Sequence, residues 1–399
     1  MKIAIISNTR PHAGGMTTYI NAVAYGFRKL GHDVDIISLL GKSRERKNKP
    51  EFTRKIDNIL KNRGGLTVFL FVLSKLMVFF QFIGAYLKTK YDFIYVLDVS
   101  AANGIRPLEK LLKLKVVFNP IVSLYQELLS QGKIKQKGWP IRYLIKQEKR
   151  AYRGARAIIA IAKYTVRYFN EIARKKLPVT IVRAPFNEKN FYFDPSTKNE
   201  FRKKYSCQNE FLILFIARLV EREGPFVIFE AFKKIMETEK DIFLIYAGEG
   251  EAEETLRNLV KKHGLENKIK ILGFIPDEEL NKAYNSADVL AMPVFTHKGV
   301  KKGQGIVPLE AMACHLPVIA SACGGLKDII QNEKNGLLIP EKDPAALTKA
   351  ILRIKHDTAL RKRLIDQGIK DSNKYKSEVI AQQILEVYRN FFESKNTNR

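Results

Sequence analysis

The sequence has little cysteine, and the three cysteines it has form no recognisable pattern. Cys207, Cys314 and Cys323 are spaced neither as a disulfide framework nor as a zinc site. A reducing, cytoplasmic compartment is the simplest interpretation of that scarcity. The sequence also lacks a repeat of fixed period. Its first residues, MKIAIISNTR, lack a charged leader followed by an apolar core and a cleavage site, so we expect a buried strand there instead of a signal peptide.

Acidic residues are scarce in the first half of the chain only. Residues 1–190 hold 36 Lys and Arg against 12 Asp and Glu, a net +24, whereas residues 191–399 hold 33 against 29, a net +4. A basic unit of this kind attracts nucleic acid, an anionic membrane or a phosphorylated substrate, although lysines that merely solvate helices give the same count. The aromatic and basic interleaving of a nucleic-acid module is missing, and we expect no nucleic-acid partner.

Short apolar runs alternate with helical patterns in both halves, which predicts βαβ units and parallel sheets. The strands expected in the first half are Ile3–Ser7, Val34–Ser38, Phe93–Val96, Val116–Phe118, Ala157–Ala160 and Thr180–Val182. Those expected in the second half are Phe211–Ile216, Ile242–Ala247, Ile269–Leu272, Val289–Met292, Val318–Ala320 and Gly336–Ile339. The repetition predicts two doubly wound α/β domains, over residues 1–188 and 189–375, with a linker at Pro185–Pro195. The tail 376–399 has apolar residues at helical spacing between Lys376 and Glu393, which predicts an amphipathic helix that needs a surface to cover.

One apolar segment, Leu66–Leu87, stands apart from this alternation. Its 22 residues are enough to span a membrane, but Lys75 lies in the middle and there is no second span. Because basic residues flank both ends, a helix lying on the membrane surface fits the composition better. A buried or dimer-forming helix is the alternative.

Glycine-rich loops follow several of the expected strands. Gly14 and Gly15 precede a helix expected over Thr17–Leu30, and paired glycines there let backbone N–H groups approach an anion. The strand Ile242–Ala247 ends at Gly248, which begins a Gly-Glu-Gly turn that suits a ribose or a phosphate. A purely steric need for glycine in a tight turn explains both loops equally well.

Charged and aromatic side chains follow other strands. Arg218 lies just past Phe211–Ile216, at the carboxyl end where open α/β sheets bind ligands, and a guanidinium there can hold a diphosphate. An ion pair of Arg218 with a neighbouring glutamate is the alternative. Backbone near Phe274 is placed to read a base edge, and Asp277 is placed to cap the next helix.

The loop before the helix of Glu310 completes this series. Gly303, Gln304, Gly305 and Ile306 precede the helix, and their N–H groups are placed to hold phosphate or sugar oxygens. A carboxylate at Glu310, on the first turns of the helix, can accept both hydroxyls of a ribose.

Five ordered motifs of the second half resemble the retaining GT-B glycosyltransferases of family 4, the glycosyl transferases group 1. They read ARLVEREG, GEG, GFIPDEELNKAYNSADV, KGQGIVPLEAMACHLPVIA and NGLLIPEKDPAAL. The first half is similar through PHAGGMTTYI and GHDVDII. The resemblance covers nearly the whole chain. It implies an α/β protein with the GT-B fold, in which two Rossmann-like doubly wound parallel-sheet domains face a cleft and the tail helix crosses back to the first domain.

By the same resemblance, Arg218 would hold the donor diphosphate and Glu310 the ribose, with residues 303–306, Gly248 and Phe274 near the donor. Gly14 and Gly15 would face that site from the first domain. No protein nucleophile and no metal or other cofactor is expected, because the leaving phosphate helps to deprotonate the acceptor while the protein positions the reactants and stabilises charge.

This chain departs from the family pattern at two charged positions. Glu223 stands where the family usually has lysine, and Lys302 stands where it usually has glutamate. We hypothesise a swap, in which Lys302 supplies charge to the phosphate while Glu223 pairs with it or meets a sugar hydroxyl. Arg222 or Lys301 filling the phosphate role is the alternative.

The first half departs as well. Asn119 follows the strand Val116–Phe118 where the family commonly has histidine, and Ala184-Pro185 replaces an Asn-Gly turn. The residues that bind the acceptor therefore cannot be inferred from the family pattern.

The sequence predicts a hexosyltransferase that moves a sugar from a UDP-, GDP- or ADP-sugar to a lipid-linked or glycolipid acceptor with retention of configuration. We expect it at the inner face of the cell membrane, in polysaccharide or glycolipid synthesis, held there by the basic first domain. A catalytically silent protein that binds a nucleotide-sugar or a partner enzyme is the alternative. The sequence leaves the sugar, the base, the acceptor and the oligomeric state open.

Overall fold

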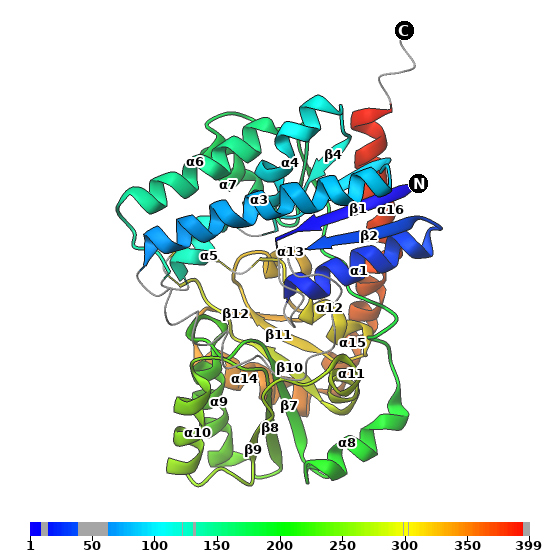
Figure 1. The fold of residues 1–399 in the computed structure, drawn as a ribbon. Helices are drawn as coiled ribbons and strands as arrows, with labels where there is room; N and C mark the ends of the chain where they lie inside the picture. Colours follow the sequence, from blue (N-terminus) through cyan, green and yellow to red (C-terminus); the bar gives the residue numbers. More distant parts are fainter. Residues whose placement is uncertain are drawn as a thin grey trace. The chain divides into compact units, whose positions relative to one another are not determined.

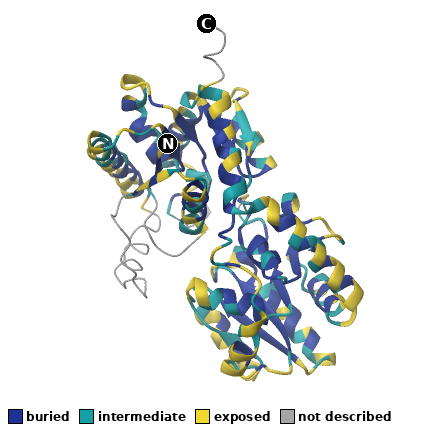
Figure 2. Ribbon diagram, turned by 90° about the vertical axis from the view of Figure 1, so that its right-hand side faces the viewer, coloured by how far each residue is buried: buried dark blue, intermediate teal, exposed yellow. Residues whose placement is uncertain are grey.

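The protein folds as two compact units of similar size. The computed structural model describes residues 1–8, 15–38, 63–121, 123–130, 133–297, 299–301 and 303–393. The first unit is Met1–Pro185 together with Ser377–Arg399, and the second is Phe186–Lys376. Each unit holds a six-stranded sheet, with buried central strands, that is covered by helices (Figures 1 and 2). The first boundary thus lies after Pro185, where we expected it after residue 188.

The first unit alternates strands and helices along the chain. Its strands are β1 (Lys2–Ser7), β2 (Asp33–Ser38), β3 (Phe93–Val96), β4 (Val116–Phe118), β5 (Ala157–Ala160) and β6 (Val179–Ile181). Its helices are α1 (Gly15–Lys29), α3 (Gly64–Lys88), α4 (Val99–Leu111), α5 (Leu124–Ser130), α6 (Trp139–Gly154), α7 (Lys163–Ala173) and α16 (Ser377–Phe392). All strand pairs are parallel, in the order β2-β1-β3-β4-β5-β6. The central strands are apolar and buried on both faces, as parallel sheets require.

The second unit repeats this plan with a different strand order. Its strands are β7 (Phe211–Ile216), β8 (Ile242–Ala247), β9 (Ile269–Ile271), β10 (Val289–Met292), β11 (Val318–Ser321) and β12 (Leu337–Ile339). Its α-helices are α8 (Lys198–Lys204), α9 (Pro225–Thr238), α10 (Glu253–Lys262), α11 (Asp277–Ser286), α12 (Val307–Ala313), α13 (Leu326–Ile329), α14 (Pro344–His356) and α15 (Thr358–Ser372). Three short 3-10 helices, η1 (Pro195–Thr197), η2 (Glu221–Glu223) and η3 (Asn373–Tyr375), also belong to this unit. The parallel sheet has the order β12-β11-β10-β7-β8-β9.

Helix α16 belongs to the first unit although it follows the second unit in the sequence. It packs along α1, and the two backbones come so close that a Cβ on Gly26 would overlap the carbonyl of Ser377. The tail helix also places Tyr388 against Phe93, with ring centroids 4.7 Å apart. Its apolar side is therefore buried within the first unit.

The structure confirms the two-domain α/β fold that the sequence predicts, with strand limits within one residue of those expected. One local expectation was wrong. Asp277 does not cap α11: the N-cap is Pro276, which makes no side-chain cap, and Asp277 begins the helix. The Asp277 carboxylate instead accepts a hydrogen bond from Asn190 Nδ2 at 2.9 Å. Pro276 takes the extended N-cap conformation but has no side-chain acceptor, and Asp277 is already the first helical residue.

Candidate functional site

The point where strand order reverses marks the candidate site in the second unit. From β7 the chain runs outward through β8 and β9, and then returns to build β10, β11 and β12 on the other side. Loops after β7 and β10 therefore diverge at the carboxyl edge of the sheet, and open α/β sheets bind ligands in the crevice between such loops. Arg218 and Glu223 follow β7, and residues 293–306 follow β10.

Direct contacts tie the loops after β7 and β10 together. Phe295 donates its backbone N–H to the carbonyl of Arg222 at 2.9 Å. Gly224, with φ of 82°, caps α9, and a Cβ there would overlap the carbonyl of Pro293. Glycine is thus required at position 224 both by its left-handed backbone and by the closeness of the second loop. This packing fixes the turn that carries Glu223.

Glu223 is almost wholly buried, with 2% of its surface exposed. Its carboxylate lies 3.6 Å from Nε of Arg222, a half-buried neighbour. Lys302, the other half of the predicted swap, lies outside the described residues, so its pairing with Glu223 stays a prediction. Lys301, the alternative cation, is exposed.

Glycines also bring the loops after β7, β8 and β9 together. A Cβ on Gly248 would overlap the carbonyl of Ala217, and one on Gly250 would overlap that of Leu219. Gly248 also donates its N–H to the carbonyl of Gly273 at 2.7 Å. The steric explanation of the Gly-Glu-Gly turn therefore holds in this structure, and the turn forms a close-packed floor next to Arg218.

Arg218 and Phe274 are also accessible at this edge. Arg218 is exposed on the loop after β7. Phe274, which follows β9, exposes 47% of its surface, far more than a core aromatic would. An exposed aromatic ring at this place can stack on a base.

Glu310 lies on the first turn of α12 and is 3% exposed. Its Oε2 accepts a hydrogen bond from the Tyr284 hydroxyl at 2.7 Å, and Tyr284 comes from the buried side of α11. Burial raises the pKa of Glu310 to about 8, although the tyrosine hydrogen bond acts the other way. This pKa lies near neutral pH, so hydroxyl donors from a ligand would stabilise the ionised form of the Glu310 carboxyl. The sequence signal for Tyr284 was the tyrosine in the third motif, to which we had assigned no role.

The loop of residues 303–306 rests on a second glycine turn. A Cβ on Gly325 would come within 2.9 Å of the Gln304 backbone, and Gly305 has a φ of 75°. The side chain of Gln304 is fully buried and that of Ile306 nearly so. Any contact of these two residues with a donor would therefore come from their backbone. Gly303 is half-buried at the same loop.

Glu341 is a further residue of this edge that the sequence did not single out. Its carboxylate accepts from the backbone N–H of Thr296 at 2.6 Å and from the Thr296 hydroxyl at 3.1 Å. These two bonds lower the pKa of Glu341 against the opposing effect of burial. The residue anchors the loop that leads from β10 toward Lys301.

In the first unit the strand order reverses between β1 and β3. Asn8, just after β1, donates its N–H to Asp98 at 2.5 Å, and Asp98 also caps α4 by accepting from Ala101 at 2.8 Å. Gly15 begins α1, and a Cβ there would meet nothing within 4 Å, so packing does not demand a glycine. Gly14 lies outside the described residues.

A buried polar triad takes the place of the family's histidine in the first unit. Asn119 Nδ2 donates to the hydroxyls of Tyr19 at 2.7 Å and Tyr95 at 2.5 Å, and the two hydroxyls lie 2.8 Å apart. All three residues are buried. The triad joins α1, β3 and the end of β4, which fixes the carboxyl edge of this sheet. Sequence reasoning had noted Asn119 without finding its partners.

A second buried acid, Glu148 on α6, lies in the same unit. It accepts from the hydroxyls of Ser123 at 3.1 Å and Tyr168 at 2.5 Å, and from the N–H of Tyr125 at 3.2 Å. Burial raises its pKa to about 7 in spite of these donors. No pattern in the sequence distinguishes this glutamate from the surface residues around it.

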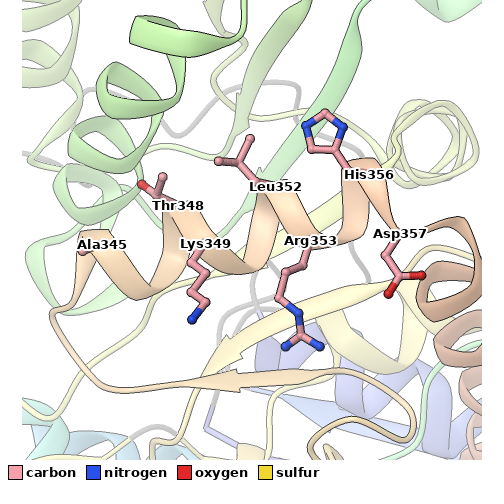
Figure 3. A pocket seen from close by; sticks show the side chains of 7 residues that line it. All are labelled: Ala345, Thr348, Lys349, Leu352, Arg353, His356 and Asp357. Atoms are coloured by element: carbon pink, nitrogen blue, oxygen red, sulfur yellow. The ribbon is translucent and has the colours of Figure 1, made fainter.

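A surface hollow in the second unit lies away from these residues. Figure 3 shows its lining, which is Ala345, Thr348, Lys349, Leu352, Arg353, His356 and Asp357. All of them come from α14 and its C-terminal cap, and none comes from a loop at the carboxyl edge of the sheet. We therefore place the candidate site at that edge and not in this hollow.

Comparison with known proteins gives the family of both units. The sequence profile of the glycosyl transferases group 1 matches residues 196–371, and that of the glycosyl transferase 4-like domain matches residues 14–185. The solved structure of Anabaena HepE in complex with UDP and glucose shares the fold, with a TM-score of 0.70 at 18% identity over 98% of this chain and 100% of that one.

Two curated relatives match a shorter part of the chain. An uncharacterized glycosyltransferase of Methanocaldococcus jannaschii is 34% identical over 194 residues, 48% of each protein. The phosphatidyl-myo-inositol mannosyltransferase of Mycobacterium leprae is 34% identical over 177 residues, 44% of this chain and 46% of that protein. The chain thus spans about half the length of the curated relatives it matches. With its two domains matched in order, the chain belongs to the group 1 glycosyltransferases of the GT-B fold.

Proposed function

We propose that the protein is a hexosyltransferase that takes a sugar from a nucleoside-diphosphate sugar and passes it, with retention of configuration, to a lipid-linked or glycolipid acceptor. The observation that carries this is Glu310, a buried carboxyl with a raised pKa at the carboxyl edge of the second sheet. The acceptor class is supported by the mannosyltransferase relative, whose name includes phosphatidyl-myo-inositol.

In this proposal the residues of the second unit bind and orient the donor. Arg218 holds the diphosphate, Glu310 accepts the ribose hydroxyls, and exposed backbone next to Phe274 meets the base. Glu223 and Lys302 act near the sugar and the phosphates as a swapped charge pair. The leaving phosphate takes the acceptor proton, so the protein supplies position and charge stabilisation and no nucleophile.

Donor binding and turnover test this proposal together. A thermal-shift panel of UDP-, GDP- and ADP-sugars should raise the melting temperature with one base only, because a ligand that binds the native state alone stabilises it. Release of free nucleotide with that donor and a lipid acceptor should follow. We expect turnover to persist in EDTA, since the proposed chemistry needs no metal. Absence of a shift with every donor would overturn the proposal.

The departures from the family pattern at Glu223 and Lys302 leave a second candidate, a catalytically silent protein that binds a nucleotide-sugar or a partner enzyme. Here the two charges would reflect a lost activity. Glu223→Lys and Lys302→Glu should each lower kcat more than the double reversal if the pair is a functional swap. Additive effects on kcat would show that Glu223 and Lys302 do not act as a swapped pair. A donor that shifts the melting temperature but is never turned over would support the silent protein.

The reaction is proposed to take place at the inner face of the cell membrane, where a lipid-linked acceptor and a cytoplasmic donor meet. The net +24 of residues 1–190 supports attraction to anionic lipid. Cell fractionation checks the location: the protein should sediment with membranes at low salt and be released at high salt. Recovery in the soluble fraction at low salt would contradict it.

A further inference from the structure

Helix α3 is built into the first unit along one face. Ser74 Oγ lies 2.7 Å from Ser100 Oγ of α4, and a Cβ on Gly104 would come within 2.8 Å of the Lys75 carbonyl. Val78 and Phe82 are fully buried on the same face. α3 also packs beside α6, with the rings of Phe71 and Tyr143 6.4 Å apart. This face therefore forms part of the core of the unit.

The opposite face of α3 is apolar and exposed. Residues three and four apart in sequence share this face, which we call the outer stripe. Its most exposed members are Leu87 at 81%, Phe80 at 66% and Phe69 at 61%, and with them lie Leu70, Leu73, Leu76 and Met77. Large contiguous apolar patches on a protein surface mark sites of association with protein or membrane.

The outer stripe has a basic border. α6 flanks the stripe on one side, since a Cβ on Gly65 would lie 3.5 Å from the ring of Trp139, which is 56% exposed at the start of α6. Residues 133–154 hold eight Lys and Arg against one acid, Glu148, which is buried. The exposed cations among them are Lys135, Lys137, Arg142, Lys146, Arg150 and Arg153. Burial lowers the pKa of Lys75, and the charge of Arg150 on α6 adds to this effect.

Length and composition alone would let α3 cross a membrane, and among the described helices it is the only one with that property. Spanning would require α3 to leave α4 and α6, and would uncover the core face that holds Ser74, Val78 and Phe82. A surface position keeps that face packed and uses the exposed one. The basic border also disfavours a second copy of this chain as the occupant, because two such borders would face each other and repel.

We propose that the outer stripe of α3 docks on an anionic lipid bilayer, with Trp139 at the level of the headgroups and the cations of α6 against them. Apolar side chains beside tryptophan and lysine or arginine are typical of helices that lie in the membrane interface. This deepens the proposed function, because it names the surface on which a lipid-linked acceptor would be met.

Trp139 makes the test direct, because it is the single tryptophan of the chain. Vesicles of phosphatidylcholine with about one third phosphatidylglycerol should shift its emission to shorter wavelength, and brominated lipids should quench it. Vesicles of phosphatidylcholine alone should give a much smaller shift. An unchanged emission spectrum with anionic vesicles, together with no co-sedimentation, would overturn the proposal.

Matched variants test whether vesicle binding depends on the outer stripe or is non-specific. Phe69→Ser with Phe80→Ser should lower vesicle partitioning on the order of tenfold or more, whereas Leu111→Ser, at an exposed leucine of α4, should leave it unchanged. Lys146→Glu with Arg150→Glu should lower it by about fivefold or more per charge at low salt. The control is Lys175→Glu with Lys176→Glu, at exposed lysines beyond α7. Equal losses in variants and controls would contradict a specific surface.

Two further measurements keep this proposal apart from the proposed function. Donor turnover with a water-soluble acceptor should be unaffected by Phe69→Ser with Phe80→Ser, so loss of vesicle binding with full turnover supports the docking surface. Light scattering of the wild-type protein detects the other occupant: a dimer that the same variant dissociates, without vesicle binding, would make the stripe an interface between copies. Failure of donor binding alone would overturn the proposed function and leave the docking surface intact.

Discussion

The two units use the same layered plan for different tasks. Both have six parallel strands with helices on the faces, and both reverse strand order once. In the second unit the loops at that reversal are drawn together by glycines that admit no side chain, at Gly224, Gly248 and Gly250. In the first unit the corresponding edge is held by side-chain hydrogen bonds of Tyr19, Tyr95 and Asn119. Backbone contacts give a rigid floor, whereas side-chain contacts can be exchanged without changing the fold.

The units also differ in what they leave uncovered. The first carries nearly all the net charge and the exposed apolar stripe of α3. The second is nearly neutral and leaves Arg218 and Phe274 exposed at the edge of its sheet. This division suits one unit that meets a surface and another that holds a small anionic ligand.

The largest effect of a single substitution on stability should come from Gly224, one of the glycines that let the loops of the second unit pack together. Gly224→Ala places a Cβ against the Pro293 carbonyl at a left-handed φ, and should lower the free energy of unfolding of the second unit by about 3–5 kcal/mol. Gly264→Ala is the matched control, since Gly264 has a φ of 62° but nothing within 4 Å of its Cβ, and should cost about 1 kcal/mol. Urea unfolding measures both, and equal costs would show that the loops do not press on each other.

Next in size is the pH dependence of the two buried acids. Burial raises the pKa of Glu310 to about 8 and that of Glu148 to about 7, above the value near 4.5 of an exposed glutamate. Between pH 4.5 and these values the folded protein holds protons that the unfolded chain has lost, so stability falls as pH rises through this window. The contribution should be on the order of 5 kcal/mol for Glu310 and on the order of 3 kcal/mol for Glu148.

Glutamine variants show which of the two buried acids causes the fall in unfolding free energy with pH. Glu310→Gln should flatten the fall in unfolding free energy up to about pH 8, and Glu148→Gln should flatten it up to about pH 7. Urea melts at a series of pH values give both slopes. A slope that neither variant changes would mean that other groups control it.

A moderate effect is expected on donor binding. Glu310→Gln removes the carboxylate proposed to accept ribose hydroxyls, and should weaken the nucleotide by roughly 10- to 100-fold, about 1.5–3 kcal/mol. Wild-type affinity should rise with pH up to about 8, because the ionised form accepts two hydroxyls, and the variant should lose this rise. Calorimetric titration at several pH values checks both. Unchanged affinity in the variant would remove Glu310 from the donor site.

The smallest effect concerns the polar triad of the first unit. Tyr19→Phe removes a hydroxyl bonded to Tyr95 and Asn119, and should cost about 1 kcal/mol. Tyr152→Phe is the matched control, because the buried Tyr152 hydroxyl has no hydrogen-bond partner among the described residues and its loss should cost almost nothing. Thermal unfolding measures the stability that each variant loses. Equal losses would show that the triad does not stabilise the carboxyl edge of the first sheet.

The fold was predictable because its signals are local. Apolar runs such as Phe211–Ile216 and Ile242–Ala247 are strands in both the sequence prediction and the structure. Glu310 could be placed on the first turn of a helix for the same reason, since the glycines before that helix are a local signal as well. Residues whose environment is set by distant parts of the chain could not be found. Glu148 becomes a buried acid only because α5 and α7 pack around it, and Tyr284 meets Glu310 from another helix.

The place of α16 has a consequence for the order in which the protein is made. Ser377 and Ala381 fill the space over Gly26, so the first unit lacks part of its wall until residues beyond 376 have been synthesised. The second unit, whose residues are contiguous, is complete before that moment. On the ribosome the later unit should therefore reach its native state first, and a premature stop just before α16 should harm the half of the protein that was translated earliest.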